Sequence, residues 1–266
     1  MKCDPIFRKY HQNQITFSFM YAYSENYVLV LSHDEVVHLK KSMIYKMPGT
    51  MPEKFGNLRA AYGLMMMHPG KKLLFMGQDF AQTAEWNEAK SLDWHLLEKY
   101  PEHQQLNHYY CDLLHFYQNE PALYELDDSP EGFAWINGSD AEHNMLTFCR
   151  MTKDKKNCLL CHFNFSPVAY ENFQSGVLCP GTYTEVFNSN AAEYGGTGLV
   201  NPEPIEAVKE SWDFKDYSIK YHLGAYGVCI FKFDYVEPKP EEPQKPAKRY
   251  TKEDIHKLAG HYKKVK

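Results

Sequence analysis

The chain has 266 residues, of which 44% are hydrophobic and 15% aromatic, and its formal net charge is −5 at pH 7. This composition supports one large or two ordinary folded domains and excludes a disordered or low-complexity chain. The mild negative charge gives no reason to expect nucleic acid or an anionic membrane as a partner, and no run of 18 apolar residues predicts a membrane span.

The N-terminus and the cysteines bear on the cellular compartment. The first five residues, Met-Lys-Cys-Asp-Pro, lack the apolar stretch of a secretory signal. The seven cysteines form no small-domain framework, which is typical of reduced thiols. We therefore expect a soluble protein in the cytoplasm.

The first part of the chain, residues 1–118, alternates short apolar runs with helical patterns. Residues 27–31 and 72–76 are apolar runs typical of parallel strands that are buried on both faces. Residues 55–67 and 106–117 repeat apolar side chains at helical spacing. This alternation predicts parallel β/α units. Because a complete (β/α)8 barrel needs about 250 residues, we expect an incomplete, C-terminal part of such a barrel.

The pattern changes in residues 119–236, where turn residues separate short apolar runs. Asn-Gly, Pro-Gly and Gly-Gly pairs supply the turns. This spacing predicts an antiparallel β-sandwich, so the expected fold class is α/β followed by all-β. The expected strands cover residues 133–136, 145–149, 159–165, 183–187 and 228–233.

Two cysteines at 158 and 161 have the spacing of a metal or redox pair. They lie in a run that reads as a strand, where residues i and i+3 point to opposite faces and their Cα atoms are roughly 10 Å apart. That geometry excludes a disulfide and shared zinc coordination. We interpret Cys158 and Cys161 as structural.

The last segment, residues 237–266, combines a Pro/Lys/Glu-rich linker with a predicted tail helix. The helix is expected to begin at Thr251, where a capping-box-like pattern occurs. Residues 245–266 contain eight Lys or Arg and two acids. A solvated basic helix is the simpler interpretation. Docking on an acidic surface, of this chain or of a partner, is the alternative.

The pair His33-Asp34 lies where the apolar run 27–31 ends, one residue beyond it. In β/α barrels the carboxyl ends of strands carry the catalytic residues. Polar groups at the end of a buried strand also need hydrogen-bond partners. Position alone therefore leaves two interpretations open, a catalytic pair and a structural hydrogen-bonded pair.

An ordered series of motifs favours the first interpretation. Tyr-x-Tyr-Ser-Glu-Asn at 21–26 is followed by Leu-Ser-His-Asp-Glu-Val-Val-His-x-Lys-Lys at 31–41. Further motifs lie at residues 46–49, 55–59, 68–77, 85–87, 91–98 and 188–196. The series covers about residues 4–236 and resembles the glycogen (1,4-α-glucan) branching enzymes of the α-amylase clan. Plain amylases share the His-Asp pair without the other motifs, which disfavours a hydrolase.

The resemblance implies roles for individual residues. Asp34 matches the carboxylate that stabilises the oxocarbenium-like transition state, and His33 matches the histidine that binds the sugar at the cleavage point. Near them, Glu35 and His38 either line the substrate groove or orient the loop. Of the two tryptophans near these motifs, Trp86 is a better candidate than Trp94 for stacking on a sugar ring.

Other aromatic and sulfur-containing residues have a structural interpretation. Trp94 is expected to pack within the fold, and so are the methionines 65–67. The lysines at 40 and 41 need no functional interpretation.

Four residues depart from the family pattern. Val30 stands where proline is usual, and Ala84 where arginine is frequent. Asp79, which we predict as a substrate contact, replaces the usual glutamate. Leu39 replaces glycine, so the loop behind His38 is expected to be strained or reshaped.

The resemblance implies a retaining transfer of an α-1,4-glucan segment to a glucan 6-hydroxyl, which creates an α-1,6 branch. It requires no cofactor and no metal. No motif for the nucleophile or for the acid/base occurs in this chain, so we expect the isolated chain to be inactive. Its expected partners are an α-glucan such as glycogen or amylose, and the missing N-terminal half of the enzyme. A non-catalytic glucan-binding or scaffold protein derived from such an enzyme is the alternative.

Overall fold

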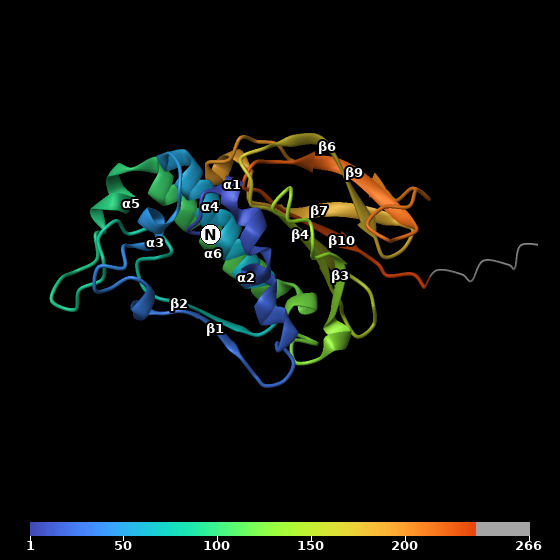
Figure 1. Cartoon of the computed structure of the whole chain (residues 1–266), viewed down its shortest axis with the longest axis horizontal. Coiled ribbons are helices and arrows are strands. Elements are labelled where there is room, and N and C mark those ends of the chain that lie inside the picture. The colour runs from blue at the N-terminus through green and yellow to red at the C-terminus, as the bar shows by residue number, and fades with distance from the viewer. Residues whose placement is uncertain (238–266) are drawn as a thin grey trace, which may run out of the picture. The chain divides into compact units, whose positions relative to one another are not determined.

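The N-terminal half of the chain combines two long helices and several short ones with one pair of strands (Figure 1). Strands β1 (Val28–Leu31) and β2 (Lys71–Leu74) pair in parallel, with Val28 opposite Lys71. This arrangement confirms the predicted parallel β/α connection. The helices are α1 (Pro5–Arg8), α2 (Gln12–Thr16), α3 (Met43–Lys46), α4 (Met51–Met67), α5 (His95–Lys99) and α6 (Pro101–Asn119), with 3-10 turns at Lys9–His11, Phe17–Met20, His33–Glu35, Pro121–Leu123 and Pro130–Gly132.

The second half is built from antiparallel strands, as predicted. Six strands form one sheet in the order β3-β4-β5-β10-β7-β8, and β6 and β9 form a separate pair. Three strands were missed in the sequence because polar residues interrupt their apolar pattern: β6, β8 and β9. The bounds are β3 (Phe133–Asn137), β4 (Met145–Arg150), β5 (Cys158–Asn164), β6 (Tyr170–Val177), β7 (Thr182–Asn188), β8 (Ile205–Glu206), β9 (Tyr217–Leu223) and β10 (Val228–Phe233), with a 3-10 turn at Ala192–Tyr194.

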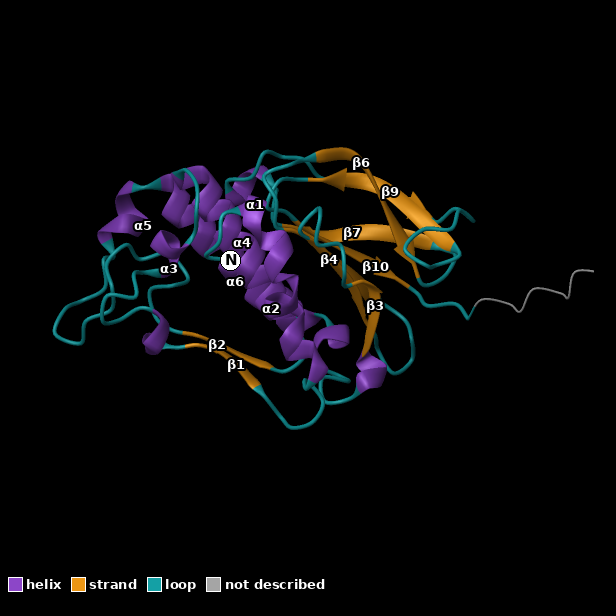
Figure 2. Cartoon of the chain, viewed as in Figure 1, coloured by secondary structure: helices purple, strands orange, loops and turns teal. Residues whose placement is uncertain are grey.

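The large sheet is covered on both faces. One face packs against α4 and α6, which lie between it and the parallel pair (Figure 2). The other face packs against the β6–β9 pair. Within β5, Cys161 belongs to the first core and Cys158 to the second, and both are free thiols. The structural interpretation of the two cysteines is therefore confirmed.

Helix α4 lies in the first core, where it packs against α6 and against strands β5 and β10 of the large sheet. A reciprocal capping box between Thr50 and Glu53 begins it. Its interior glycine, Gly63, allows the strand residue Val228 to approach so closely that an added Cβ would lie 2.8 Å from a methyl carbon of that valine. Three consecutive methionines at its end, residues 65–67, are buried, which confirms their predicted packing role.

The prediction that the two parallel strands are buried on both faces is wrong for this chain. Leu29 and Leu31 pack against the core, but Val28 and Val30 are each 50% exposed. On β2, Leu73 is 42% exposed. The physical reason is that β1 and β2 pair only with each other among the described residues, and no described layer covers their second face.

The structure is a computed structural model that describes residues 1–237, and Met1–Val236 form one unit. The predicted tail helix at Thr251 lies outside the described residues. The predicted domain boundary between residues 118 and 119 stays a prediction. In the described part of the chain, no helix combines the length and apolar character needed to cross a membrane.

Candidate active site

The candidate site begins where β1 ends. Residues His33–Glu35 form a 3-10 turn, which Ser32 caps by accepting a hydrogen bond from the Asp34 N–H at 3.2 Å. His33 Nε2 lies 3.4 Å from Asp34 Oδ1. The side chains of His33 and Asp34 are 51% and 69% exposed. The structure therefore places the Asp34 carboxylate at the open rim of the sheet and not under packed apolar residues.

Gln78, four residues after the end of β2, holds this turn by hydrogen bonds, and the sequence analysis gave it no role. The Gln78 side chain is buried, and its Nε2 donates to the carbonyls of Leu31 at 3.3 Å and Ser32 at 3.4 Å. The carboxyl ends of parallel strands meet at one edge of the sheet, so a polar residue after β2 can reach the residues that follow β1. The signal in the sequence was a glutamine two residues after the second apolar run, which ends at Met76.

Trp86 joins the same group. Its ring is edge-on to His33 with centroids 5.8 Å apart, and Phe75 packs at 5.2 Å. The backbone N–H of Trp86 donates to the carbonyl of Val36 at 2.9 Å. The structure thus brings Trp86 to the His33–Asp34 turn, with one side of its ring held against the core.

The loop after the turn has an unusual backbone. His38, Leu39 and Lys41 have φ angles of 54°, 66° and 68°, in the left-handed region. For a side chain such as leucine this conformation costs roughly 1–2 kcal/mol relative to the right-handed one. The prediction of a strained loop at Leu39 is therefore confirmed. The Leu39 side chain itself is 94% exposed.

Two polar residues hold this loop, and neither was assigned a role from the sequence. The Glu85 carboxylate accepts hydrogen bonds from the N–H groups of Leu39 at 3.0 Å and Lys41 at 2.6 Å. These two bonds, that to Lys41 first, lower the pKa of Glu85. Lys40 Nζ donates to the carbonyl of Asp34 at 2.7 Å. Lys40 thus contacts the turn through its side chain and Lys41 contacts Glu85 through its backbone, and the prediction that neither lysine has a function stays a prediction.

Glu35 lies beside His33 and Asp34 but faces another direction. Its carboxylate is 3.2 Å from the buried ammonium of Lys46. Both residues line a cavity of about 440 Å³ between β1, the N-terminal helices and α4. Glu35 is thus tied to the helical side of the turn, whereas His38 lies in the loop on the Glu85 side.

Asp79 and Trp94 lie apart from this group. The Asp79 carboxylate accepts a hydrogen bond from Asn107 Nδ2 on α6 at 2.9 Å, and burial raises its pKa. Its role as a substrate contact stays a prediction. Trp94 was expected to be packed, but it is 54% exposed, with its ring against Phe80 at a centroid distance of 5.4 Å. It begins the short helix α5, and a residue at a helix start has few neighbours to cover it.

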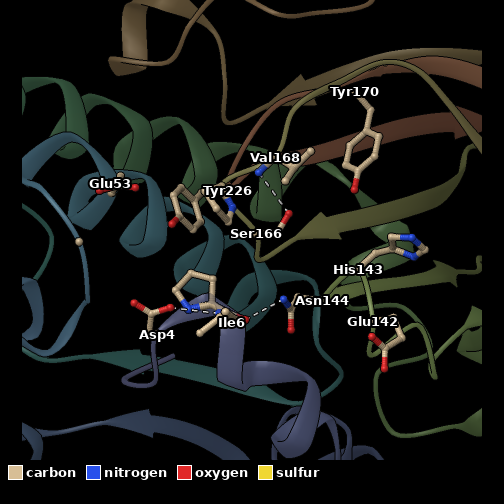
Figure 3. A pocket seen from close by; sticks show the side chains of 13 residues that line it. Asp4, Ile6, Glu53, Glu142, His143, Asn144, Ser166, Val168, Tyr170 and Tyr226 are labelled. Carbon is tan, nitrogen blue, oxygen red and sulfur yellow. Dashed lines mark hydrogen bonds between the residues drawn. The ribbon is translucent and has the colours of Figure 1, made fainter.

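A second cavity, of about 460 Å³, lies away from the turn (Figure 3). It opens between the start of α1, the start of α4 and two turns of the sandwich, and it contains none of the predicted site residues. Asn144 closes its floor by donating to the carbonyl of Pro5 at 3.0 Å. Among residues 1–237, no group of three or more His, Cys, Asp or Glu is arranged to hold a metal ion.

Comparisons with known proteins agree with this architecture. Residues 135–234 match the sequence model of the family described as "Alpha amylase, C-terminal all-beta domain". The 1,4-alpha-glucan branching enzyme of Shewanella frigidimarina is 46% identical over 231 residues, which is 87% of this chain and 31% of that enzyme. The enzyme of the same name from Halothermothrix orenii is 47% identical over 232 residues, which is 87% of this chain and 37% of that enzyme.

This chain is related to the 1,4-alpha-glucan branching enzymes. The matched length exceeds that of the all-beta domain, so the similarity to branching enzymes extends beyond the sandwich. The chain spans about a third of the length of these relatives. Among solved structures, a pullulanase from Anoxybacillus sp. LM18-11, complexed with maltotetraose, superposes with a TM-score of 0.55 at 10% identity, covering 87% of this chain and 31% of the pullulanase. That likeness supports the fold alone.

Proposed function

We propose that this chain provides the C-terminal portion of a glycogen branching enzyme, with residues 1–118 as the last part of its (β/α)8 barrel. The observation that carries the proposal is the exposed Asp34 carboxylate at the carboxyl end of a parallel strand, within a chain 46% identical to a branching enzyme. Barrel enzymes place their catalytic groups at that end of the strands. A location in the cytoplasm stays a prediction.

In this proposal Asp34 stabilises the transition state. A retaining transfer passes through a state in which the sugar ring carries positive charge. A fixed carboxylate near that charge stabilises the transition state more than it stabilises the neutral glucan. The capped 3-10 turn supplies the fixed position, because Ser32 and Lys40 hold the backbone of Asp34 from two sides.

The neighbours of Asp34 then bind the glucan. The exposed face of His33 donates or accepts a hydrogen bond with a sugar hydroxyl, and its other face lies against Trp86. The outer side of Trp86 offers an apolar surface for a sugar ring. Glu35 and His38 flank the turn, Glu35 fixed by Lys46 and His38 by the loop backbone.

The complete reaction needs further residues. A retaining enzyme uses a nucleophile and an acid/base in addition to the stabilising carboxylate, and no family-like motif for either occurs in this sequence. The uncovered faces of β1 and β2 are where further barrel strands would pack, since Val28 and Val30 are half-exposed. We therefore propose that the upstream part of a branching enzyme is the partner of this chain.

A chimera tests the proposal. This chain would replace the matching segment of the Halothermothrix orenii enzyme, and the product from amylose would be followed by loss of iodine staining and by NMR of α-1,6 linkages. The chimera is expected to form α-1,6 linkages, and the 266-residue chain alone none. Branching by the chain alone contradicts the proposed division of catalytic groups. A folded chimera that binds amylose without branching it favours the glucan-binding alternative.

A further inference from the structure

Glu85 occupies a central position in the loop next to the His33–Asp34 turn. Its two carboxylate oxygens accept from two backbone N–H groups of one loop, those of Leu39 at 3.0 Å and Lys41 at 2.6 Å. A carboxylate that bridges two backbone donors restrains the distance between them and the dihedral angles of the residue enclosed by them. The enclosed residue is Lys40, whose side chain reaches the Asp34 carbonyl.

The loop needs such a restraint because its backbone is unfavourable. Both residues held by Glu85 are in the left-handed region, with φ angles of 66° and 68°. The 94% exposed side chain of Leu39 makes no packing that would keep it there. Strained conformations of this kind persist where surrounding contacts fix them.

The next residue along the chain, Trp86, completes the attachment. Its N–H donates to the carbonyl of Val36 at the start of the loop, and its ring meets His33. Residues 85 and 86 therefore contact the loop at its start and at its end. Through Lys40 and His33, the same attachment reaches both members of the candidate catalytic pair.

We propose that Glu85 is a positioning residue, which holds Leu39 and Lys41 of the loop 36–41 in their left-handed conformation and so fixes the backbone that carries His33 and Asp34. Its consequence for catalysis rests on the proposed function above. The effect of Glu85 on the conformation of the loop does not depend on that function. The lowered pKa of Glu85, caused first by the N–H of Lys41 and then by that of Leu39, agrees with a carboxylate that stays charged in this place.

Amide hydrogen exchange of the 266-residue chain tests the loop directly. Glu85→Ala should raise the exchange rates of the Leu39 and Lys41 amides roughly tenfold, because each loses its acceptor. The matched control is Glu88→Ala, since Glu88 is an exposed carboxylate three residues further on to which the described residues donate no hydrogen bond. Equal exchange rates in Glu85→Ala and the unsubstituted chain would overturn the proposal.

The chimera separates positioning from a general structural role. Glu85→Ala is expected to lower kcat roughly tenfold with little change in KM, because the glucan contacts remain while Asp34 loses its fixed position. Adding Leu39→Gly should restore part of kcat, since glycine adopts the left-handed conformation without help. Unchanged kcat, or a loss of kcat that Leu39→Gly does not relieve, would overturn the positioning role. The exchange measurement does not depend on enzyme activity, so it tests the role of Glu85 in the loop separately from the proposed function. The proposed function is tested by Asp34→Asn.

Discussion

The six-stranded sheet of the sandwich and the parallel pair β1–β2 differ in how completely they are covered. In the sandwich, every residue of β4 and β5 is buried, because helices lie on one face and the β6–β9 pair on the other. In the parallel pair, residues of β1 alternate between exposed and half-buried. Strand β1 is wholly aliphatic, whereas β5 contains His162 and Asn164, so the lower burial of β1 comes from its surroundings and not from its composition.

The sandwich therefore has a core covered on both faces, whereas the parallel pair presents a surface available for interaction. The apolar side chains of the sandwich are buried by described parts of the chain, as expected of a region that stabilises the fold. The parallel pair leaves apolar side chains and strand edges open at the same place where it presents His33 and Asp34. Open strand edges readily pair with further strands. Stability and the proposed chemistry are thus assigned to different sheets, and substitutions can test that assignment.

The largest effect on stability is expected for Arg150→Ala. Arg150 is fully buried on β4, forms an ion pair with Asp127 at 3.0 Å, and donates to the carbonyl of Met67 at 2.7 Å. Loss of the buried guanidinium removes the donor to the carbonyls of Met67 and Leu123 and leaves Asp127 with Lys71 at 3.6 Å, whose side chain is mostly exposed. Breaking a buried pair in this way costs about 3–5 kcal/mol. Chemical denaturation measures the loss in the free energy of unfolding. The exposed pair Lys220–Glu210 is the control, and Lys220→Ala should lower stability by less than about 1 kcal/mol. Equal effects of the two substitutions would contradict this expectation.

The same substitution in the two sheets should give different results. Leu160→Ala in the sandwich removes a fully buried side chain and should lower the free energy of unfolding by about 2–5 kcal/mol. Leu73→Ala on β2, where the leucine is 42% exposed, should lower it by less than about 1 kcal/mol. Thermal or urea unfolding of both variants provides the comparison. A loss at Leu73 as large as that at Leu160 would show that the parallel pair is as well covered as the sandwich.

The sandwich should also lose stability in acid through His162. Burial lowers the pKa of this histidine to about 3, and its Nδ1 lies 2.7 Å from the Tyr221 hydroxyl. Because the folded state disfavours the charged form, the unfolded state takes up the proton first. The contribution is complete above the ordinary pKa of about 6.5 and is lost as the pH falls below it, by about 2 kcal/mol at pH 5. Urea unfolding at pH 7 and pH 5 measures this loss, and His162→Gln should show a smaller difference between the two pH values. An identical difference in both proteins would exclude His162 as its source.

A small gain is expected for Leu39→Gly in the loop beside the parallel pair. Glycine removes the strain of the φ angle of 66°, although it increases the entropy of the unfolded chain. The free energy of unfolding should rise by up to about 1 kcal/mol. Leu39→Ala is the control, because alanine keeps the Cβ atom that causes the strain. A gain with alanine equal to that with glycine would point to the removal of the exposed apolar side chain as the cause.

The sequence predicts elements whose signal is local. Strands such as 133–136 and 228–233 stand out as apolar runs, and α4 as the helical repeat at residues 55–67. Strand β9 was missed because its core residues alternate with Lys220 and His222. The burial of β1 was overestimated because burial depends on which layers cover a strand, and the strand's own residues do not encode that.

The same limit applies to the candidate site. The position of His33 and Asp34 just after an apolar run left a catalytic and a structural interpretation open, and the resemblance to branching enzymes favoured the first; Trp86 was singled out because it lies in a polar motif. Glu85 and Gln78 were given no role, since each binds backbone groups about 46 residues away in the sequence. A side chain that binds backbone groups can do so whatever side chains those residues carry, so the sequence contains no pattern that predicts such contacts.

The most direct test of the central claim is the rate of α-1,6 linkage formation by the chimera with Asp34→Asn. We predict a loss of at least about 100-fold, because the amide has the shape of the carboxylate without its charge. Asp128→Asn, at an exposed aspartate in the loop after α6, should leave the rate unchanged and serves as the control. A chimera that keeps its full rate with the Asp34→Asn substitution would contradict the assignment of this carboxylate to the transition state.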